Sequence, residues 1–317
     1  ISQLLLHRDM KVYSDINSLP HFPNAVITTG SFDGVHSGHV LILEQLVKEA
    51  EEKNGTPVVI TFFPHPKQVV QIKDKPLHIL NTPGEKYELL HSKGIKNIVV
   101  VPFDKSFAEL SAQDYIEQFL VKRFDPAVIV VGYDHRFGNN RDGDYNLLKK
   151  AGAAFNFEVK EIPEHVLKNI TISSTKIREA MLAGDIKTAA EYLGYDYFFS
   201  GTVVEGNKLG RTIGYPTANL QIEDENKLVP ANGVYAVDVE LNHRSLKGMM
   251  NIGVRPTVNG TKRVTEVNLF DFDEEIYGQS LKITLKQWLR SEVKFSGLDE
   301  LKAQLGRDKE EAMKVNK

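Results

Sequence analysis

The stretch A-V-I-T-T-G-S-F-D-G-V-H-S-G-H-V, residues 25–40, decides how the first half of the chain folds. It begins with a β-rich apolar run over residues 25–29, and apolar residues at helical spacing follow from Val40. The turn between them holds His36 and His39 on either side of Gly38. Glycines let a ligand approach the backbone, and a helix N-terminus offers free N–H groups and the positive end of the helix dipole. This strand–turn–helix unit is therefore a candidate polyphosphate site.

Short β-rich runs alternate with helical patterns throughout the first half. The predicted strands cover residues 25–29, 57–63, 97–102 and 127–132, and the predicted helices cover residues 40–53, 84–92 and 112–124. This alternation predicts a parallel α/β sheet with right-handed crossovers. Ligands bind beyond the carboxyl ends of the strands in such sheets. His36, His65 and Asp134 each follow a predicted strand closely, so we expect all three at one edge of the sheet.

The pattern changes from about residue 198. Short strand-like runs are then separated by Gly, Pro or Asn turns, at residues 201–205, 233–241, 248–252, 264–272 and 281–285. Apolar and polar residues alternate in the last of these runs, which is typical of an antiparallel sheet with one buried face. A closing amphipathic helix carries Leu298, Leu301 and Leu305 on one stripe. The second half is thus predicted to be a small antiparallel β-barrel or sandwich with a C-terminal helix.

A helical connector is predicted over residues 177–194, and it separates the two patterns. We place the boundary inside it, which gives domains at residues 1–187 and 188–317. A chain of 317 residues is long for one domain, so two domains are the natural expectation.

Composition narrows the class of protein. The chain has 39 basic and 42 acidic residues, a net charge of −3, so no basic field favours a nucleic-acid partner. No apolar run is long enough to cross a membrane, and the first residues lack the pattern of a signal peptide. Zero cysteines exclude disulfides, thiolate catalysis and Cys-ligated metals. We expect a cytoplasmic protein without nucleic-acid or membrane partners; a weak homo-oligomer is compatible with the sequence.

The H-x-G-H motif, preceded by F-D-G-V, resembles the signature of the nucleotidylyltransferase superfamily and, more narrowly, of prokaryotic FAD synthetases. By themselves the residues leave two alternatives open: a zinc half-site, which would need further His, Asp or Glu ligands, and a pair of turn histidines. The stretch I-S-S-T-K-I-R, residues 172–178, is similar to a second motif of the superfamily. Its three hydroxyls ahead of Lys176 and Arg178 suit phosphate binding, although hydroxyls at a helix start can also be caps alone.

The resemblance implies transfer of AMP from ATP to the phosphate of FMN. It implies that His36 and His39 are the catalytic residues on the ATP phosphates, and that Ser174, Thr175 and Arg178 bind phosphate. It also assigns Asp33, His65 and Asp134 to the flavin site. Two positions depart from the family: Phe63, where a polar residue is usual, and His135, where Phe is more common.

The stretch G-R-T-I-G-Y-P-T-A-N-L, residues 210–220, resembles the riboflavin kinase signature. Thr217 and Asn219 are two apart on an extended segment, so their side chains face the same way and offer the hard oxygen ligands that suit Mg²⁺. Alone, the pattern favours a strand edge with an Asx-type turn. The resemblance implies that Gly210, Arg211, Thr217 and Asn219 bind ATP, and that Thr217 and Asn219 hold Mg²⁺.

Glu266 stands in the run T-E-V-N-L-F-D-F, residues 265–272. Strand alternation places it on one face with Val264, Asn268 and Phe270, and a carboxyl among apolar neighbours should have the raised pKa that suits a general base. A surface salt bridge is the plainer alternative. The resemblance assigns to Glu266 the proton of the terminal ribityl hydroxyl of riboflavin. It also places Arg290 in the flavin site.

Taken together, the resemblance implies a bifunctional riboflavin kinase/FMN adenylyltransferase. Its expected fold is a Rossmann-like nucleotidylyltransferase domain with a parallel sheet, followed by a riboflavin kinase-like antiparallel β-barrel with a C-terminal helix. Its expected substrates and products are riboflavin, FMN, FAD and ATP, with Mg²⁺ as cofactor. One alternative keeps only one active half. Another is a flavin-binding regulator without turnover, which we would expect to lack Glu266, Asn219 or a motif histidine, yet all are present.

Overall fold

The computed structural model describes residues 9–70, 77–163, 172–206, 209–257 and 260–315. The chain divides into two compact units, Ile1–Ser174 and Thr175–Lys317. The boundary predicted between residues 187 and 188 falls within helix α10 (Ile186–Leu193), the second of two helices in the predicted connector. The first is α9 (Ser174–Ala183). The predicted division into functional domains at residues 187 and 188 therefore stays a prediction.

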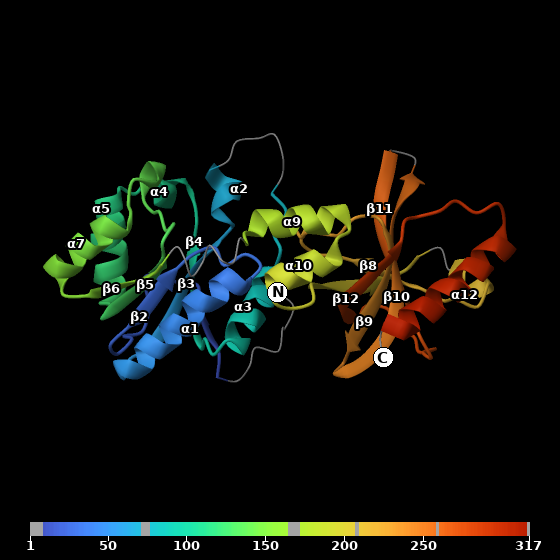
Figure 1. Ribbon diagram of the computed structural model, residues 1–317, viewed down its shortest axis with the longest axis horizontal. Helices are drawn as coiled ribbons and strands as arrows, with labels where there is room; N and C mark the ends of the chain where they lie inside the picture. The colour runs from blue at the N-terminus through green and yellow to red at the C-terminus, as the bar shows by residue number, and fades with distance from the viewer. Residues whose placement is uncertain (1–8, 71–76, 164–171, 207–208, 258–259, 316–317) are drawn as a thin grey trace. The chain divides into compact units, whose positions relative to one another are not determined.

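The first unit contains a six-stranded sheet in the order β1-β4-β3-β2-β5-β6, and its neighbouring strands pair in parallel (Figure 1). The strands are β1 (Lys11–Tyr13), β2 (Val26–Thr29), β3 (Pro57–Phe63), β4 (Asn97–Pro102), β5 (Val128–Gly132) and β6 (Glu158–Ile162). The four predicted strands and their parallel arrangement are confirmed. The sequence did not predict β1 and β6, the two edge strands, because one is three residues long and the other alternates charged and apolar residues weakly.

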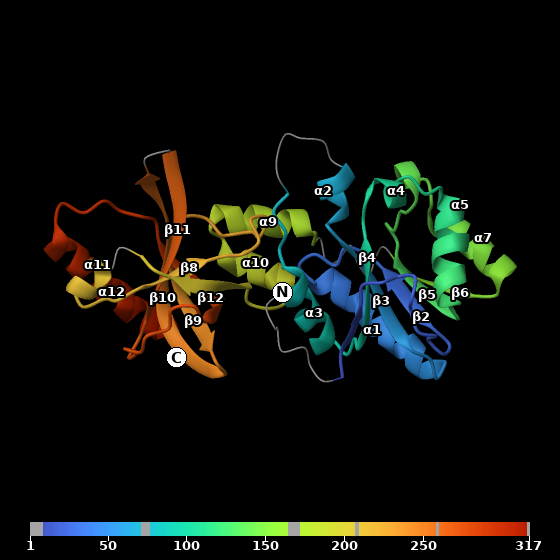
Figure 2. The same ribbon diagram turned by 180° about the vertical axis from the view of Figure 1, so that it is seen from behind.

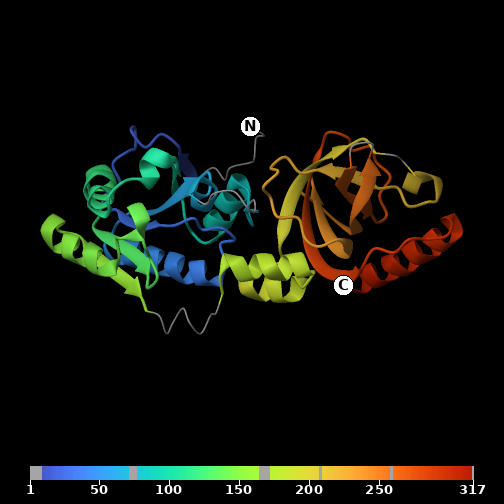
Figure 3. The same ribbon diagram turned by 90° about the horizontal axis from the view of Figure 1, so that it is seen from above.

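Helices cover both faces of this sheet (Figure 3). They are α1 (Ser37–Glu52), α2 (Pro66–Val70), α3 (Pro83–Ser92), α4 (Lys105–Ala108), α5 (Ala112–Asp114), the π-helical η1 (Tyr115–Val121), α6 (Lys122–Phe124), the 3₁₀ turn η2 (Asn139–Arg141) and α7 (Tyr145–Phe155). The predicted helix over residues 112–124 is thus continuous but wider in its middle. Ser111 caps the start of this stretch, because its hydroxyl accepts a hydrogen bond from Asp114 N at 3.0 Å.

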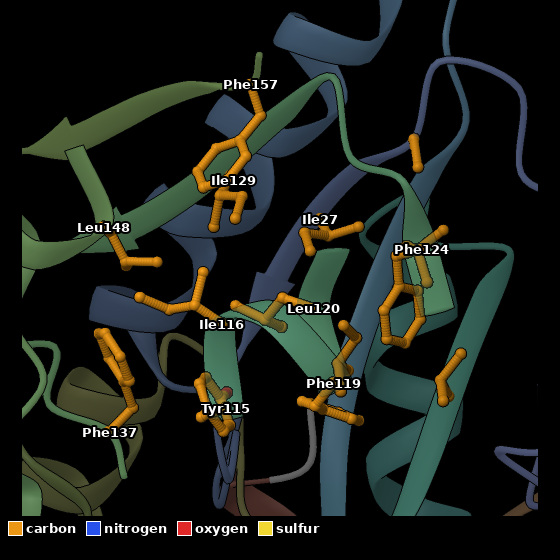
Figure 4. Packing of buried hydrophobic residues seen from close by; sticks show 14 of the residues in the cluster. Ile27, Tyr115, Ile116, Phe119, Leu120, Phe124, Ile129, Phe137, Leu148 and Phe157 are labelled. Atoms are coloured by element: carbon orange, nitrogen blue, oxygen red, sulfur yellow. The ribbon is translucent and has the colours of Figure 1, made fainter. Parts of the chain in front are cut away.

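One core cluster of the first unit lies between that helical stretch and the sheet. Figure 4 shows Tyr115, Ile116, Phe119 and Leu120 packed toward Ile27 of β2 and Ile129 of β5, with Phe124, Phe137, Leu148 and Phe157 around them. These side chains are almost completely removed from solvent. Each contributes about 1.5–3 kcal/mol of burial free energy, so the cluster fixes β2 and β5 side by side. Those two strands carry the candidate phosphate site at their carboxyl ends.

The second unit contains a closed barrel in the order β10-β11-β8-β7-β12-β9, with antiparallel pairing throughout. Its strands are β7 (Phe198–Val204), β8 (Ala218–Gln221), β9 (Gly233–Leu241), β10 (Arg244–Thr257), β11 (Gly260–Leu269) and β12 (Ser280–Arg290). The short α11 (Leu209–Thr212) precedes β8, and α12 (Leu298–Val315) closes the chain. Because the strands form a closed ring, the second half is a barrel, one of the two predicted alternatives. The predicted fold class is confirmed for both halves.

Helix α12 packs along the outside of the barrel (Figure 2). Its buried Ala312 contacts a cluster formed by Ala236 of β9, Met249 of β10 and Phe270. The small side chain of Ala312 lets the helix approach the strands closely. The strands and α12 together form the walls of a cavity.

Candidate active sites

The H-x-G-H loop adopts a strained path between β2 and α1. Phe32 and Val35 have φ angles of +47° and +37°, a region that β-branched and bulky residues rarely adopt. Such strain costs on the order of 1–3 kcal/mol per residue and persists only where the surrounding structure enforces it. The path places His36 at the N-cap of α1, where its Nδ1 accepts a hydrogen bond from His39 N at 3.4 Å. The two imidazoles then stack with centroids 3.7 Å apart.

Asp33 fastens this loop to the rest of the unit. It is 1% exposed, and its Oδ1 accepts hydrogen bonds from Leu80 N at 2.8 Å and Asn81 N at 3.3 Å. The Ser174 hydroxyl donates to the Asp33 carbonyl at 2.9 Å, which brings the second predicted motif to the first. Asp33 thus has a structural role, because it connects the loop to residues 80, 81 and 174. Its predicted contact with flavin stays a prediction.

His39 is neutral in this environment. Its pKa lies well below the usual range, first because burial disfavours the charged ring, and then because the charges of His36 and Lys86 repel it. Among the described residues no hydrogen-bond partner reaches its buried Nδ1. A neutral imidazole is a hydrogen-bond donor and acceptor, so His39 can contact a phosphate without carrying charge itself.

Sequence reasoning missed Lys86, which lies in α3 and is 7% exposed. Burial lowers its pKa to about 8, and the nearby Asp33 carboxylate opposes that effect. A signal was present in the sequence, because Lys86 precedes Leu89 and Leu90 at the i, i+3, i+4 spacing of a buried helix face.

His65 and Asp134 follow β3 and β5, the two neighbours of β2 in the sheet. All three predicted histidine and aspartate positions therefore follow adjacent parallel strands, as expected. His65 Nδ1 accepts a hydrogen bond from Lys67 N at 3.1 Å, which orders the turn into α2. Asp134 is exposed in the turn after β5. Their roles toward flavin stay predictions.

His135, a departure from the family pattern, packs against the core. Its ring lies 5.7 Å from that of Phe137, and burial lowers its pKa to about 4, with a smaller contribution from Arg141. A neutral ring beside an aromatic side chain explains how His replaces Phe at this position.

Thr175 and Arg178 follow Ser174 in α9 and belong to the second compact unit. Their predicted binding of ATP phosphates stays a prediction.

The barrel unit has a cavity of about 220 Å³ between the strands and α12. Apolar and polar side chains share its wall. The apolar ones include Met249, Met250, Val293, Phe295, Leu301 and Leu305, and the polar ones include Thr217, Asn251, Arg255, Glu266, Asn268, Arg290 and Glu292. A wall that combines apolar surface with polar groups is typical of a site for a flat organic ligand.

Glu266 lines this cavity and is the middle residue of a polar row across three strands. In the barrel register it lies directly opposite Asn219 on β8 and opposite Asn251 on β10, so the three side chains share a face. Its Oε2 accepts a hydrogen bond from Arg255 Nη2 at 2.6 Å, with 14% of the Glu266 side chain exposed. The predicted apolar surroundings are therefore incomplete, because the neighbouring strand places a guanidinium beside the carboxylate. Strand alternation cannot reveal such a cross-strand partner.

The segment that carries Thr217 and Asn219 is held by close backbone packing. Asn268 is buried, and its Nδ2 donates to the Pro216 carbonyl at 2.7 Å. A Cβ at Gly206 would lie 2.0 Å from Asn219 Nδ2, so only glycine leaves room for that amide. A Cβ at the predicted Gly210 would likewise lie 2.2 Å from the Tyr215 carbonyl oxygen, in a turn closed by the Tyr215 N to Gly210 O hydrogen bond. Asn268 is a further residue that the prediction left without a role.

Thr217 also lines a second cavity of about 490 Å³. The predicted Arg211 lines this cavity together with the acidic stretch Asp273–Glu275. Thr217 is therefore shared by two neighbouring spaces, one of which contains Glu266. That arrangement can present two ligands to each other.

Arg290 lines the first cavity, but its guanidinium is engaged by the protein. Nε and Nη2 donate to the two carboxylate oxygens of Asp308 at 2.8 and 2.6 Å, and Nη1 donates to the Ser291 carbonyl at 2.9 Å. Asp308 lies in α12 and its side chain is 1% exposed. Arg290 thus fastens α12 to β12, and its predicted contact with flavin stays a prediction.

Comparison with known proteins finds a different family in each half of the chain. The FAD synthetase family matches residues 19–176, and the riboflavin kinase family matches residues 193–316. The chain is 38% identical over 302 residues to the bifunctional riboflavin kinase/FMN adenylyltransferase of Escherichia coli (strain K12), covering 94% of this chain and 96% of the relative. It is 37% identical over 298 residues to the Bacillus subtilis (strain 168) protein of the same name, covering 92% of each. The chain therefore belongs to the family of bifunctional riboflavin kinase/FMN adenylyltransferases.

A solved structure is also similar over nearly the whole chain. It is a protein of Streptococcus pneumoniae described as a macrolide-efflux protein, 33% identical, with a TM-score of 0.85 over 95% of this chain and 98% of that one. In the part of the chain that the structure describes, no helix combines the length and apolar character needed to cross a membrane.

Proposed function

We propose that Glu266 and the H-x-G-H loop mark the two active sites by which this chain makes FMN from riboflavin and FAD from FMN. One observation carries the proposal for the barrel: Glu266 lines a cavity and lies opposite Asn219 on the paired strand, and Thr217 is shared with a second cavity. Riboflavin occupies the cavity with the apolar wall, and the phosphates of ATP reach Thr217 from the other side.

In the kinase reaction Glu266 acts as the general base. Its carboxylate takes the proton of the terminal ribityl hydroxyl while that oxygen forms a bond to the γ-phosphorus of ATP. The bond from the γ-phosphorus to the β,γ-bridging oxygen breaks, and ADP leaves. Arg255 donates to Oε2 of this carboxylate at 2.6 Å, so we assign the proton transfer to the other oxygen, Oε1. Asn219 and Thr217 orient the phosphates.

In the adenylyl transfer the nucleophile is already an anion, so no protein base is required. An oxygen of the FMN phosphate forms a bond to the α-phosphorus of ATP, and pyrophosphate leaves with the α,β-bridging oxygen. His36 and His39 contribute hydrogen bonds to oxygens on which negative charge develops, at the positive end of α1. Ser174 holds the loop through Asp33, while Thr175 and Arg178 bind the β and γ phosphates. His65, Asp134 and Asp33 form the flavin side of the site.

Mg²⁺ fits the barrel site by the chemistry of its donors. Thr217 and Asn219 offer a hydroxyl and an amide oxygen, and within the described ranges no cluster of three His, Asp or Glu side chains could hold a metal ion by itself. Both facts suit an ion held mainly by nucleotide phosphates. When bound, Mg²⁺ would offset the negative charge of the phosphates. The cytoplasmic location, the lack of nucleic-acid and membrane partners and the weak homo-oligomer stay predictions.

The test uses two single substitutions in the full-length protein. Glu266→Gln should lower FMN formation from riboflavin by about 10²-fold or more, because the base is lost, yet should still convert supplied FMN to FAD. His36→Gln should form FMN and accumulate it. Glu240→Gln, an exposed carboxylate on β9, is the matched control and should change neither rate. Loss of FAD formation from supplied FMN in Glu266→Gln would contradict the division between the two sites.

A further inference from the structure

Lys86 is a buried lysine that the mechanism above does not use. It is 7% exposed, and its Nζ donates a hydrogen bond to Thr61 Oγ1 at 3.3 Å. That hydroxyl in turn donates to the Ser31 carbonyl at 3.2 Å, directly before the F-D-G-V motif. A lysine ammonium has three N–H donors, and among the described residues Thr61 alone accepts one. Lys86 is therefore linked through Thr61 to the start of the H-x-G-H loop, and two of its N–H donors remain available for a ligand.

The charged groups that face Lys86 come from the loop and from α1. The Asp33 carboxylate favours the ammonium form, and burial disfavours it. The ammonium in turn adds to the burial and the His36 charge that keep His39 neutral. Beside it on α3, the Glu85 carboxylate is engaged, because it accepts a hydrogen bond from Thr82 N at 2.8 Å. Near neutral pH Lys86 is thus a buried cation beside the loop, and the stacked histidine His39 carries no charge.

We propose that Lys86 is a positioning residue for adenylyl transfer, supplying fixed positive charge behind the H-x-G-H loop and leaving His39 a neutral hydrogen-bond donor to the ATP phosphates. The inference rests on the proposed adenylyl transfer at this loop. A buried cation attracts a triphosphate strongly because little water screens the interaction. It also requires no reorganisation during the reaction, since the Thr61 and Ser31 contacts already hold it in place.

The experiment measures FAD formation from supplied FMN, ATP and Mg²⁺ between pH 6 and 10 with the full-length protein. The variants are Lys86→Met and Lys86→Arg, with Lys93→Met as the control, an exposed lysine that caps the C-terminus of the same helix. The kinase rate of each variant, measured with riboflavin, reports on folding. NMR titration of the His39 ring is the second readout.

We expect Lys86→Met to slow FAD formation by about tenfold or more while the kinase rate is unchanged. The wild-type rate should fall as Lys86 loses its proton at alkaline pH. That decline should be absent from Lys86→Met and displaced to higher pH in Lys86→Arg, because a guanidinium stays charged. The pKa of His39 should rise in Lys86→Met, where one repelling charge is gone. Lys93→Met should match the wild type in every readout.

Three results would overturn the inference. The first is a Lys86→Met protein with the wild-type rate and an unchanged alkaline decline. The second concerns the case in which Lys86→Met also loses kinase activity and so has not folded. In that case the inference is wrong if the rate of FAD formation by Lys86→Arg falls at the same alkaline pH as the wild-type rate. The third is a wild type that forms no FAD from FMN, which would overturn the proposed function itself and this inference with it.

Discussion

His36 and His39 stack with centroids 3.7 Å apart because the loop before them holds Phe32 and Val35 in left-handed backbone conformations. That conformation is maintained by Asp33, whose carboxylate accepts two backbone N–H groups while Ser174 binds its carbonyl. The sequence indicates His36 and His39 as candidate ligand-binding residues, since their motif is short and contiguous. It does not reveal that Asp33 points inward, because the partners of Asp33 lie about fifty residues or more away in the chain.

The same limit applies to the residues missed at both sites. Lys86 approaches the H-x-G-H loop from α3, and Arg255 approaches Glu266 from the neighbouring strand. Lys86 lies outside the H-x-G-H motif, and Arg255 lies outside the sequence motif that contains Glu266. Helical periodicity could indicate that Lys86 is buried, but only the folded arrangement shows which charges it meets.

The buried ammonium of Lys86 should cost stability at neutral pH. Its pKa of about 8 in the folded protein lies below the usual 10.5, so between these values the unfolded chain holds a proton that the folded protein has released. The contribution of Lys86 to the free energy of unfolding therefore rises with pH from 8 to 10.5, and this stabilisation is lost below pH 8. The shift corresponds to about 3 kcal/mol.

Urea unfolding of wild type and Lys86→Met at a series of pH values measures this effect. The free energy of unfolding of Lys86→Met, relative to wild type, should be highest at pH 7 and should decline by about 2–3 kcal/mol between pH 8 and pH 10. A difference that does not vary with pH would show that the ammonium is not destabilised by burial. Lys93→Met should give a flat difference.

At the scale of elements, α12 is held to the barrel by one buried ion pair as well as by apolar contacts. Arg290 and Asp308 form two parallel hydrogen bonds, and their side chains are 20% and 1% exposed. Because Leu301 and Leu305 of α12 line the cavity with Glu266, the position of this helix sets the shape of the proposed flavin site. We therefore expect the pair to link the stability of α12 to substrate binding in the proposed flavin site.

Asp308→Ala should leave the Arg290 guanidinium without its partner and cost about 3–5 kcal/mol. The expected result is a raised KM for riboflavin, because α12 no longer closes the cavity wall, with unchanged conversion of FMN to FAD. Thermal unfolding and steady-state kinetics measure the two effects. Glu311→Ala, an exposed carboxylate on the same helix, is the matched control. An unchanged KM in Asp308→Ala would show that the helix does not shape the flavin site.

Most elements could be predicted from local patterns. The strands β2 to β5 and the terminal helix follow from apolar runs and helical spacing, since their burial on the sheet or the barrel imposes that periodicity. The edge strands β1 and β6 could not, because they are short or half exposed and their pairing depends on partners distant in the chain. Barrel closure likewise requires the pairing of β9 with both β10 and β12, which no local pattern encodes.

At the scale of the whole molecule, the two compact units carry different candidate phosphate sites. The first has two histidines at a helix N-terminus, where we propose that the transferred AMP and the leaving pyrophosphate bind. The second has a carboxylate opposite an asparagine on paired barrel strands, where we propose that a hydroxyl loses its proton. The two reactions consume ATP differently: the kinase step releases ADP, and the adenylyl step releases pyrophosphate.

The most direct test of this account is therefore the product balance of the wild-type protein supplied with riboflavin, ATP and Mg²⁺. Flavins are followed by chromatography, and ADP and pyrophosphate by phosphorus NMR. The account predicts that FMN appears before FAD, and that each FAD formed is accompanied by one ADP and one pyrophosphate. FMN with ADP but no pyrophosphate, or bound flavin with no product at all, would contradict it.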